Sequence, residues 1–301
     1  WAVLTRGIVG LGIMYSISPW RITFGISRTV AKRLIRFGLP FQANSFLALV
    51  KDDLLIVFLG KVLPFAEVGY IGWAKKWAEV PLRLIMDSIV RVTFPAFSRI
   101  QGAKEMLGRA IEKTLFGLSV MIFPISVGLL FFVRPFMDFI PRYDKWEPAL
   151  LSFYLFTIAS AVSSLSAPLT NALNAVGKIK TTLLLMIMWT ISTWILTVLF
   201  LSLFGFNGFS LALLIITSSL WFVVHLIKKT APFSFWKSIR VPLLGVALQG
   251  FLYLLLLGMF PDGILWHVGA GLLGVILYGG VVWMLEKGRI QAVYGSFRNA
   301  L

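Results

Sequence analysis

The sequence contains no cysteine and has little charge and little histidine. None of its 301 residues is cysteine, two are histidine, and 13% are Asp, Glu, Lys or Arg. The absence of cysteine excludes disulfides and thiolate metal sites. The sequence also has no P-loop, no HExxH motif and no nucleophile elbow, so we expect neither a metal site nor an enzyme. A chain with so few charged residues has too little polar surface to cover a soluble globule.

Apolar residues dominate what is present. They make up 58% of the chain, with 26 Phe and 11 Trp, and they recur in runs long enough to cross a bilayer as helices. We therefore expect an all-α integral membrane protein, a polytopic helical bundle with about nine transmembrane helices. The predicted spans are residues 1–18, 38–59, 68–90, 114–133, 149–173, 181–204, 208–227, 241–260 and 264–285.

The longest connections between these spans, residues 19–37, 91–113 and 228–240, are basic. We expect each to hold a short amphipathic helix at the membrane surface. If all nine spans cross, one side of the membrane receives 19 Lys and Arg residues and the other side receives 4. By the positive-inside rule, the side with 19 is cytoplasmic. The asymmetry is lost if residues 68–90 do not span, so this charged segment is predicted to cross. The net charge of +16 then reflects topology and indicates no nucleic-acid partner.

The segment GYIGWAKKWAEVPLRLIMDS, residues 69–88, places charges within an apolar run. Each Arg, Lys or Asp at a helix centre costs about 2.5 to 3.5 kcal/mol on insertion scales, so these groups cannot all face lipid. At 100° per residue the charges fall on one third of the helix. We expect this face to line water or to pair with partners. The charged residues of the face are Lys75, Lys76, Glu79, Arg83 and Asp87.

The preceding span repeats the pattern more weakly, because Asn44, Lys51 and Asp52 fall within roughly 120° of one another. Asp53 is expected to point elsewhere. The two polar faces are predicted to meet at a hydrated cavity, since ionisable groups in membrane helices usually mark substrate or ion pathways. The alternative is that the charges pair only to lock the two helices together. The candidate pathway residues are Lys51, Asp52, Lys75, Lys76, Glu79, Arg83, Asp87 and Asn44.

Small and polar residues also recur at helical spacing in the fifth span. We expect them to support close packing between helices. They are Ser160, Ser164, Ala167, Asn171 and Asn174.

The run RFGLPFQANSFLALVKDDLLIVFLGKVLPFAEVGYIGWAKKWAEVPLRLI, followed by FPAFSRIQ, resembles Wzx-type polysaccharide flippases of the multidrug/oligosaccharidyl-lipid/polysaccharide superfamily. The resemblance covers residue 32 to about residue 227. It implies that residues 32–230 form a six-helix, MATE-like C-terminal lobe and that residues 231–301 add two transmembrane helices and a cytoplasmic tail. Residues 1–31 would be the last helix of a truncated N-terminal lobe with a basic cytoplasmic linker.

The resemblance also implies a function. Such proteins carry undecaprenyl-diphosphate-linked oligosaccharides from the inner to the outer leaflet of the bacterial inner membrane by alternating access, during the synthesis of O-antigen, lipopolysaccharide and other surface polysaccharides. Lys76, Glu79 and Arg83 match the E-x-P-x-R region of that family, whose cavity cations attract the diphosphate, whereas Lys51 and Lys75 come from the helical pattern alone. The implied partners are the lipid-linked oligosaccharide, membrane lipids, and the polysaccharide polymerase and chain-length machinery.

Several alternatives remain open at the level of sequence. A cavity carboxylate could bind the H⁺ or Na⁺ that drives transport, and no other cofactor is expected. A cation-coupled multidrug antiporter and a lipid II flippase belong to the same superfamily, and four cations against three carboxylates on the two faces separate these functions only weakly. A membrane glycosyltransferase or polymerase should have a large polar outer loop, but the longest outer loop, RPFMDFIPRYDKWEP, is short.

Overall fold

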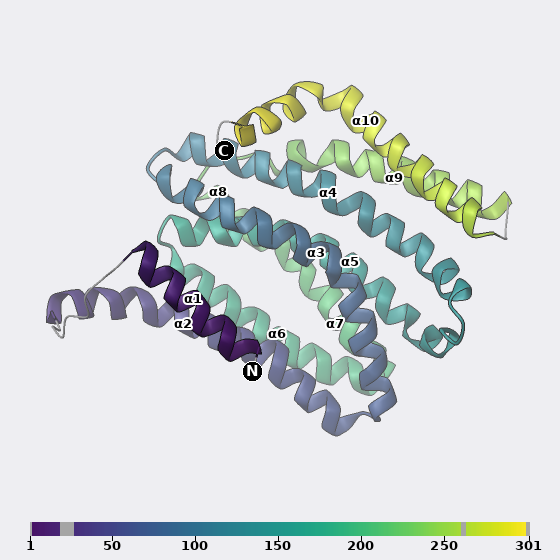
Figure 1. Cartoon of the computed structure of the whole chain (residues 1–301), viewed down its shortest axis with the longest axis horizontal. Helices are drawn as coiled ribbons and strands as arrows, with labels where there is room; N and C mark the ends of the chain where they lie inside the picture. Colours follow the sequence, from purple (N-terminus) through teal and green to yellow (C-terminus); the bar gives the residue numbers. More distant parts are fainter. Residues whose placement is uncertain (1, 19–26, 260–262, 299–301) are drawn as a thin grey trace. The chain divides into compact units, whose positions relative to one another are not determined.

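The computed structural model of the chain describes residues 2–18, 27–259 and 263–298 (Figure 1). It divides into two compact units, residues 1–40 and 41–301, and each is described by itself. The first contains α1 (Ala2–Ile17) and the beginning of α2 (Arg28–Val62). All regular structure in the described residues is helical.

The second unit holds the rest of α2 and the remaining helices. Each predicted span corresponds to one helix, except that a 3₁₀ turn, η2 (Thr217–Ser219), divides one of them into α7 and α8. The predicted all-α membrane fold is thus confirmed. The helices are α3 (Phe65–Arg99), α4 (Lys104–Phe139), η1 (Asp144–Ala149), α5 (Leu150–Ala175), α6 (Ile179–Phe204), α7 (Asn207–Ile216), α8 (Leu220–Lys228), α9 (Phe235–Met259) and α10 (Ile264–Arg298).

The prediction of separate short helices in the basic connections was wrong. Residues 91–99 continue α3, residues 104–113 begin α4, and residues 235–240 begin α9. Lys and Arg are good helix formers, so a basic segment prolongs a helix instead of ending it. With 36 residues, α4 is about 54 Å long, whereas the hydrocarbon core is about 30 Å thick. The charged ends therefore extend beyond the core. Of the predicted connection 19–37, residues 19–26 lie outside the described part.

Among the described residues, six helical segments are long and apolar enough to cross a membrane, which makes the chain a multi-pass membrane protein. They are residues 104–139, 144–175, 179–204, 207–228, 235–256 and 264–289. The predicted number of nine is not confirmed by this measure. α1 has only 16 residues, and α2 and α3, although 35 residues each, carry charges near their middle.

Proline and glycine end the helices where the chain reverses. Pro64 follows α2 and precedes α3, and a proline disfavours helical geometry in the residue before it. α5 ends in a Schellman motif, in which the Lys178 N–H bonds the Leu173 carbonyl at 2.9 Å and the Gly177 N–H bonds the Asn174 carbonyl at 3.0 Å. Gly177 has φ of 77°, a conformation that glycine adopts without a steric penalty.

The helices of the second unit alternate in direction along the chain, with α7 and α8 continuing in one direction across η2 (Figure 1). The connections at residues 100–103, 176–178 and 229–234 consequently lie at one end of the bundle. Those at 63–64, 140–149 and 205–206 lie at the other. α5 contacts α3, α4, α7 and α8, so its apolar residues form the centre of the core. This alternation brings the basic connections of residues 91–113, 178–180 and 228–240 to the same end, as the topology prediction requires.

α9 and α10 form a hairpin that packs on α4 (Figure 1). The chain reaches this hairpin through a connection held directly on α4. Gly108 faces the backbone of Pro232 so closely that a Cβ there would overlap the Pro232 carbonyl oxygen. One turn further, Glu112 accepts a hydrogen bond from the Ser234 N–H, and thereby satisfies a backbone donor at the start of α9. α4 and α9 are thus joined by both steric fit and a hydrogen bond.

Gly108→Ala should destabilise the protein by about 1 to 3 kcal/mol, because the new methyl group overlaps a backbone atom that cannot turn away. Gly117→Ala is the matched control, since a Cβ at this position of the same helix meets nothing within 4 Å and alanine favours the helix. Thermal unfolding of the purified variants in detergent measures the difference. Equal melting temperatures for the two variants would contradict the close contact.

Single cysteines test the topology. Gln101 and Phe65 are both exposed and lie at opposite ends of α3. We expect Phe65→Cys to react with an impermeant thiol reagent added to intact cells and Gln101→Cys to react only after lysis, because the basic end faces the cytoplasm. Labelling of both variants in intact cells would show that α3 does not cross the membrane.

Candidate functional site

The charged residues near the middle of α2 and α3 line a common hollow of about 630 Å³, which we call the charged cavity. α5 closes it on the third side through Ser163, Ser164 and Ala167. The structure therefore brings together every predicted pathway residue except Asn44. The charged lining residues are Lys51, Asp52, Asp53, Lys75, Lys76, Glu79, Arg83 and Asp87.

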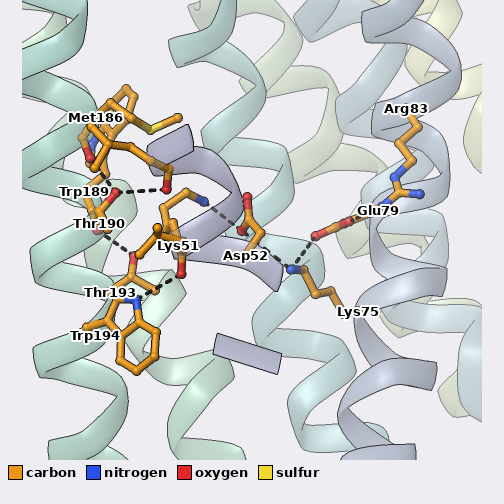
Figure 2. A network of polar contacts seen from close by, with 12 residues as sticks. Lys51, Asp52, Lys75, Glu79, Arg83, Met186, Trp189, Thr190, Thr193 and Trp194 are labelled. Carbon is orange, nitrogen blue, oxygen red and sulfur yellow. Dashed lines mark hydrogen bonds and ion pairs between the residues drawn. The ribbon is translucent and has the colours of Figure 1, made fainter. Parts of the chain in front are cut away.

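A row of ion pairs crosses from α2 to α3 (Figure 2). Lys51 Nζ lies 2.9 Å from Asp52 Oδ1, and Lys75 Nζ lies 3.9 Å from the same oxygen. On α3, Lys75 Nζ is also 3.8 Å from Glu79 Oε1, and Arg83 Nη2 is 3.2 Å from Glu79 Oε2. Lys75 thus links the two helices.

Burial differs sharply along this row. The side chain of Lys75 is 17% exposed and that of Arg83 is 74% exposed. A sequestered ammonium needs nearby carboxylates, so Lys75 depends on Asp52 and Glu79. The exposed pair of Arg83 and Glu79 contributes little to stability, because water screens it. The alternative that these charges only lock α2 to α3 thus fits Lys75 well and Arg83 poorly.

Lys76 and Asp87 line the charged cavity and are exposed. Asp53 does so as well, which corrects the prediction that it points elsewhere. Asp52 and Asp53 are neighbours on α2 and lie about 100° apart around the helix axis. Both reach the charged cavity because it extends around that side of α2. Within the described part of the chain the side chains of Lys76, Asp53 and Asp87 form no ion pair. With Asp53 included, four cations face four carboxylates, and the predicted excess of one positive charge disappears.

Asn44 lies outside the charged cavity. It sits two turns before Lys51 on α2, and its side-chain oxygen is buried with no hydrogen-bond partner among the described residues. The helical projection placed Asn44 on the correct face, but a projection does not show how far along the helix a cavity extends.

Two side chains of α6 hold α2 by its backbone, a feature that the sequence did not indicate (Figure 2). The Trp194 indole N–H donates to the Val50 carbonyl at 3.1 Å, and the Thr190 hydroxyl lies 3.4 Å from the Leu47 carbonyl. Val50 directly precedes Lys51, and Leu47 lies one helical turn earlier. The contacts fix the part of α2 that carries the ion-paired residues.

A second hollow of about 330 Å³ adjoins the first. The row of ion pairs lies where the two meet, because both are lined by Lys51, Asp52, Lys75, Glu79, Leu82, Ser163 and Ala167. We call the second hollow the hydroxyl chamber, because seven Ser and Thr residues of α5, α6 and η2 line it. Ser160 and Ala167, expected to serve helix packing, line it, whereas Ser164 is buried. The hydroxyl residues are Ser160, Ser163, Ser166, Thr170, Thr193, Thr217 and Ser219.

This arrangement is suited to binding an anion next to a polar, uncharged group. Lys76 offers a mobile point charge, and Arg83 offers a planar guanidinium that can hold two oxygens of a phosphate or carboxylate. Both are exposed at the wall of the charged cavity. Lys75, by contrast, is already engaged by two carboxylates and also lies 5.7 Å from the centre of the Phe209 ring.

Comparisons with known proteins agree with this fold. The chain is 26% identical over 145 residues to the lipopolysaccharide biosynthesis protein WzxC of Escherichia coli K12, which covers 48% of this chain and 29% of WzxC. It is 22% identical over 143 residues to the succinoglycan biosynthesis transport protein ExoT of Rhizobium meliloti 1021, which covers 46% of this chain and 28% of ExoT. The matched stretches thus span less than a third of these relatives.

A solved structure of the lipid II flippase MurJ, in an inward closed conformation, superposes with a TM-score of 0.69. It covers 93% of this chain and 59% of MurJ at 18% identity, a likeness of fold. The sequence profile of the family described as "Polysaccharide biosynthesis protein" matches residues 1–151, half of the chain. The chain therefore belongs to the polysaccharide biosynthesis protein family.

Proposed function

We propose that the protein containing this chain moves undecaprenyl-diphosphate-linked oligosaccharides from the inner to the outer leaflet of the bacterial inner membrane, by alternating access, for the synthesis of a surface polysaccharide. The observation that carries the proposal is the charged cavity, where Lys76 and Arg83 are exposed on α3. Exposed cations beside the apolar core can hold the diphosphate while the lipid chain stays in the bilayer.

The relatives support this role. WzxC is named for lipopolysaccharide biosynthesis and ExoT for succinoglycan transport, while the MurJ structure is that of a lipid II flippase. These names describe transporters and biosynthesis proteins and none describes an enzyme. Protein partners such as the polymerase and the chain-length machinery are part of the proposal.

The balance of charge in the cavity favours a second candidate, a cation-coupled antiporter. Asp53 and Asp87 line the cavity, are exposed, and have no ion pair among the described residues, so they could accept a cation. In the flippase proposal either carboxylate takes the H⁺ or Na⁺ that drives transport. In the antiporter, Asp53→Asn or Asp87→Asn should abolish resistance to cationic drugs, and the surface glycan should be unaffected.

Changing Lys76 or Arg83 to Gln in the intact protein should reduce surface glycan at least about tenfold, because each removes a charge that contacts the diphosphate. Arg83→Lys should retain part of the activity, since it keeps the charge and loses the planar fork. Arg91→Gln is the control, as Arg91 is an exposed cation of the same helix outside both hollows. The measurement is surface polysaccharide in a strain lacking the chromosomal copy. Normal export by the double variant Lys76→Gln/Arg83→Gln at normal abundance would refute the cationic cavity.

Lys75→Gln should instead lower the stability of the protein, by about 1 to 2 kcal/mol, because the link between Asp52 and Glu79 is lost. The neighbouring Lys76→Gln should change stability by less than about 0.5 kcal/mol, since it breaks no ion pair of the described residues. Thermal unfolding in detergent compares the two. If both variants melt at the same temperature, Lys75 does not tie α2 to α3.

A further inference from the structure

The hydroxyl chamber differs in chemistry from the charged cavity that it adjoins. Its charged groups lie where the two hollows meet, and Asp52 and Glu79 are both paired there with lysines. Beyond that row the lining consists of hydroxyls, alanines and apolar side chains. An anion or a cation gains little from such a lining, whereas an uncharged group with many hydroxyls can both donate to it and accept from it.

Three serines of α5 show that the chamber is built to face a polar occupant. Hydroxyls in membrane helices usually bond a carbonyl of the preceding turn, as Thr157 does with Phe153 at 2.8 Å and Thr170 with Ala167 at 2.9 Å. Ser160, Ser163 and Ser166 make no hydrogen bond within the described residues. They share one face of α5 and line the chamber, so their hydroxyls are available to a ligand.

Two hydrogen bonds fix the opposite wall of the chamber at η2, the 3₁₀ turn between α7 and α8. One comes from α6, and the other joins η2 to α7. The Trp189 indole N–H donates to the Ser219 hydroxyl at 2.8 Å, and the Thr217 hydroxyl bonds the Leu214 carbonyl at 2.6 Å. A 3₁₀ turn inside a helix often marks a functional site, and here it directs Thr217 and Ser219 to the chamber. On the same face of α6 as Thr193, the Thr197 hydroxyl is buried and has no hydrogen-bond partner among the residues that the structure describes.

The size of the chamber limits its occupant. A volume of about 330 Å³ is near the lower end of the roughly 300 to 1,000 Å³ typical of ligand pockets, so it suits one sugar ring better than a long glycan. Sugar rings present hydroxyls at their rim and C–H groups on their faces. The lining offers serine hydroxyls to the first and Trp189, Phe156 and Leu82 to the second.

We propose that the hydroxyl chamber binds the sugar residue attached to the diphosphate of the transported lipid, while Lys76 and Arg83 hold the diphosphate in the adjoining charged cavity. The inference rests on the proposed function, because it takes the ligand of the charged cavity as its starting point. Ser160, Ser163 and Ser166 are the positions that recognise the sugar.

The test measures binding of two lipids to the intact purified protein. One is undecaprenyl diphosphate, and the other is the undecaprenyl-diphosphate-linked oligosaccharide extracted from the source strain. The wild type should bind the glycosylated lipid more tightly. The double variant Ser160→Ala/Ser166→Ala changes only residues that line the chamber and not the charged cavity. It should lose about tenfold in affinity for the glycosylated lipid and should bind undecaprenyl diphosphate within about twofold of the wild type. Thr157→Val, which removes a hydroxyl of α5 that lines neither hollow, should bind both lipids normally.

A second variant keeps the inference testable if the double variant is unstable. Ser160 lines the chamber and not the charged cavity, so Ser160→Leu should fill the chamber and weaken binding of the glycosylated lipid alone. Equal weakening toward both lipids, or no weakening, would overturn the inference. Displacement of the glycosylated lipid from the wild type by excess phosphatidylglycerol would also overturn it, since the chamber would then take a lipid headgroup.

The same measurements separate the inference from the proposed function. If the wild type binds undecaprenyl diphosphate, and Lys76→Gln weakens that binding, the charged cavity holds the diphosphate whatever the serine variants do. If the wild type binds neither lipid, the proposed function fails, and the inference about the chamber fails with it.

Discussion

A lysine inside a bundle of membrane helices must find compensating charge, and Lys75 finds it on two helices at once. Asp52 of α2 lies 3.9 Å from its ammonium and Glu79 of α3 lies 3.8 Å from it. The ion pair requires Asp52 of α2 to lie level with Lys75 of α3. The hydrogen bonds from Trp194 and Thr190 to backbone carbonyls of α2 hold this part of α2 in position. The ion-paired residues line both hollows. The shapes of both hollows therefore depend on the ion pairs that Lys75 makes with Asp52 and Glu79.

Much of the fold and part of the site follow from local patterns. Hydropathy located every helix, and the 100° spacing of α3 placed Lys75, Glu79 and Arg83 on one face, because both signals are properties of a single segment. Helix ends were missed because hydropathy reports the membrane and not the helix, and Lys and Arg at the basic end continue a helix beyond the bilayer. Neither pattern predicts which residues of different helices contact one another, such as Trp194 of α6 and the Val50 carbonyl of α2.

The errors within the site have the same origin. Asp53 was assigned to another face because the projection treats a helix as having one polar side, whereas the charged cavity extends around α2. Ser160 was assigned to packing, since small residues at helical spacing usually pack. Which small residues meet a neighbouring helix and which meet a hollow is decided by the positions of α6 and α7. Those positions arise from tertiary packing, and no spacing within α5 encodes them.

The clamp between α4 and the start of α9 has a consequence for how the chain divides into moving parts. Gly108 and Glu112 hold the connection at Pro232 and Ser234, and α9 and α10 also pack along α4. A displacement of α9 or α10 is therefore expected to move α4 with it. The sequence suggests a boundary near residue 230 between the six-helix lobe and the last two helices. These contacts instead group α4, α9 and α10 into one packed unit that crosses this boundary. The rearrangements that the proposed transport requires are therefore expected at other contacts between helices.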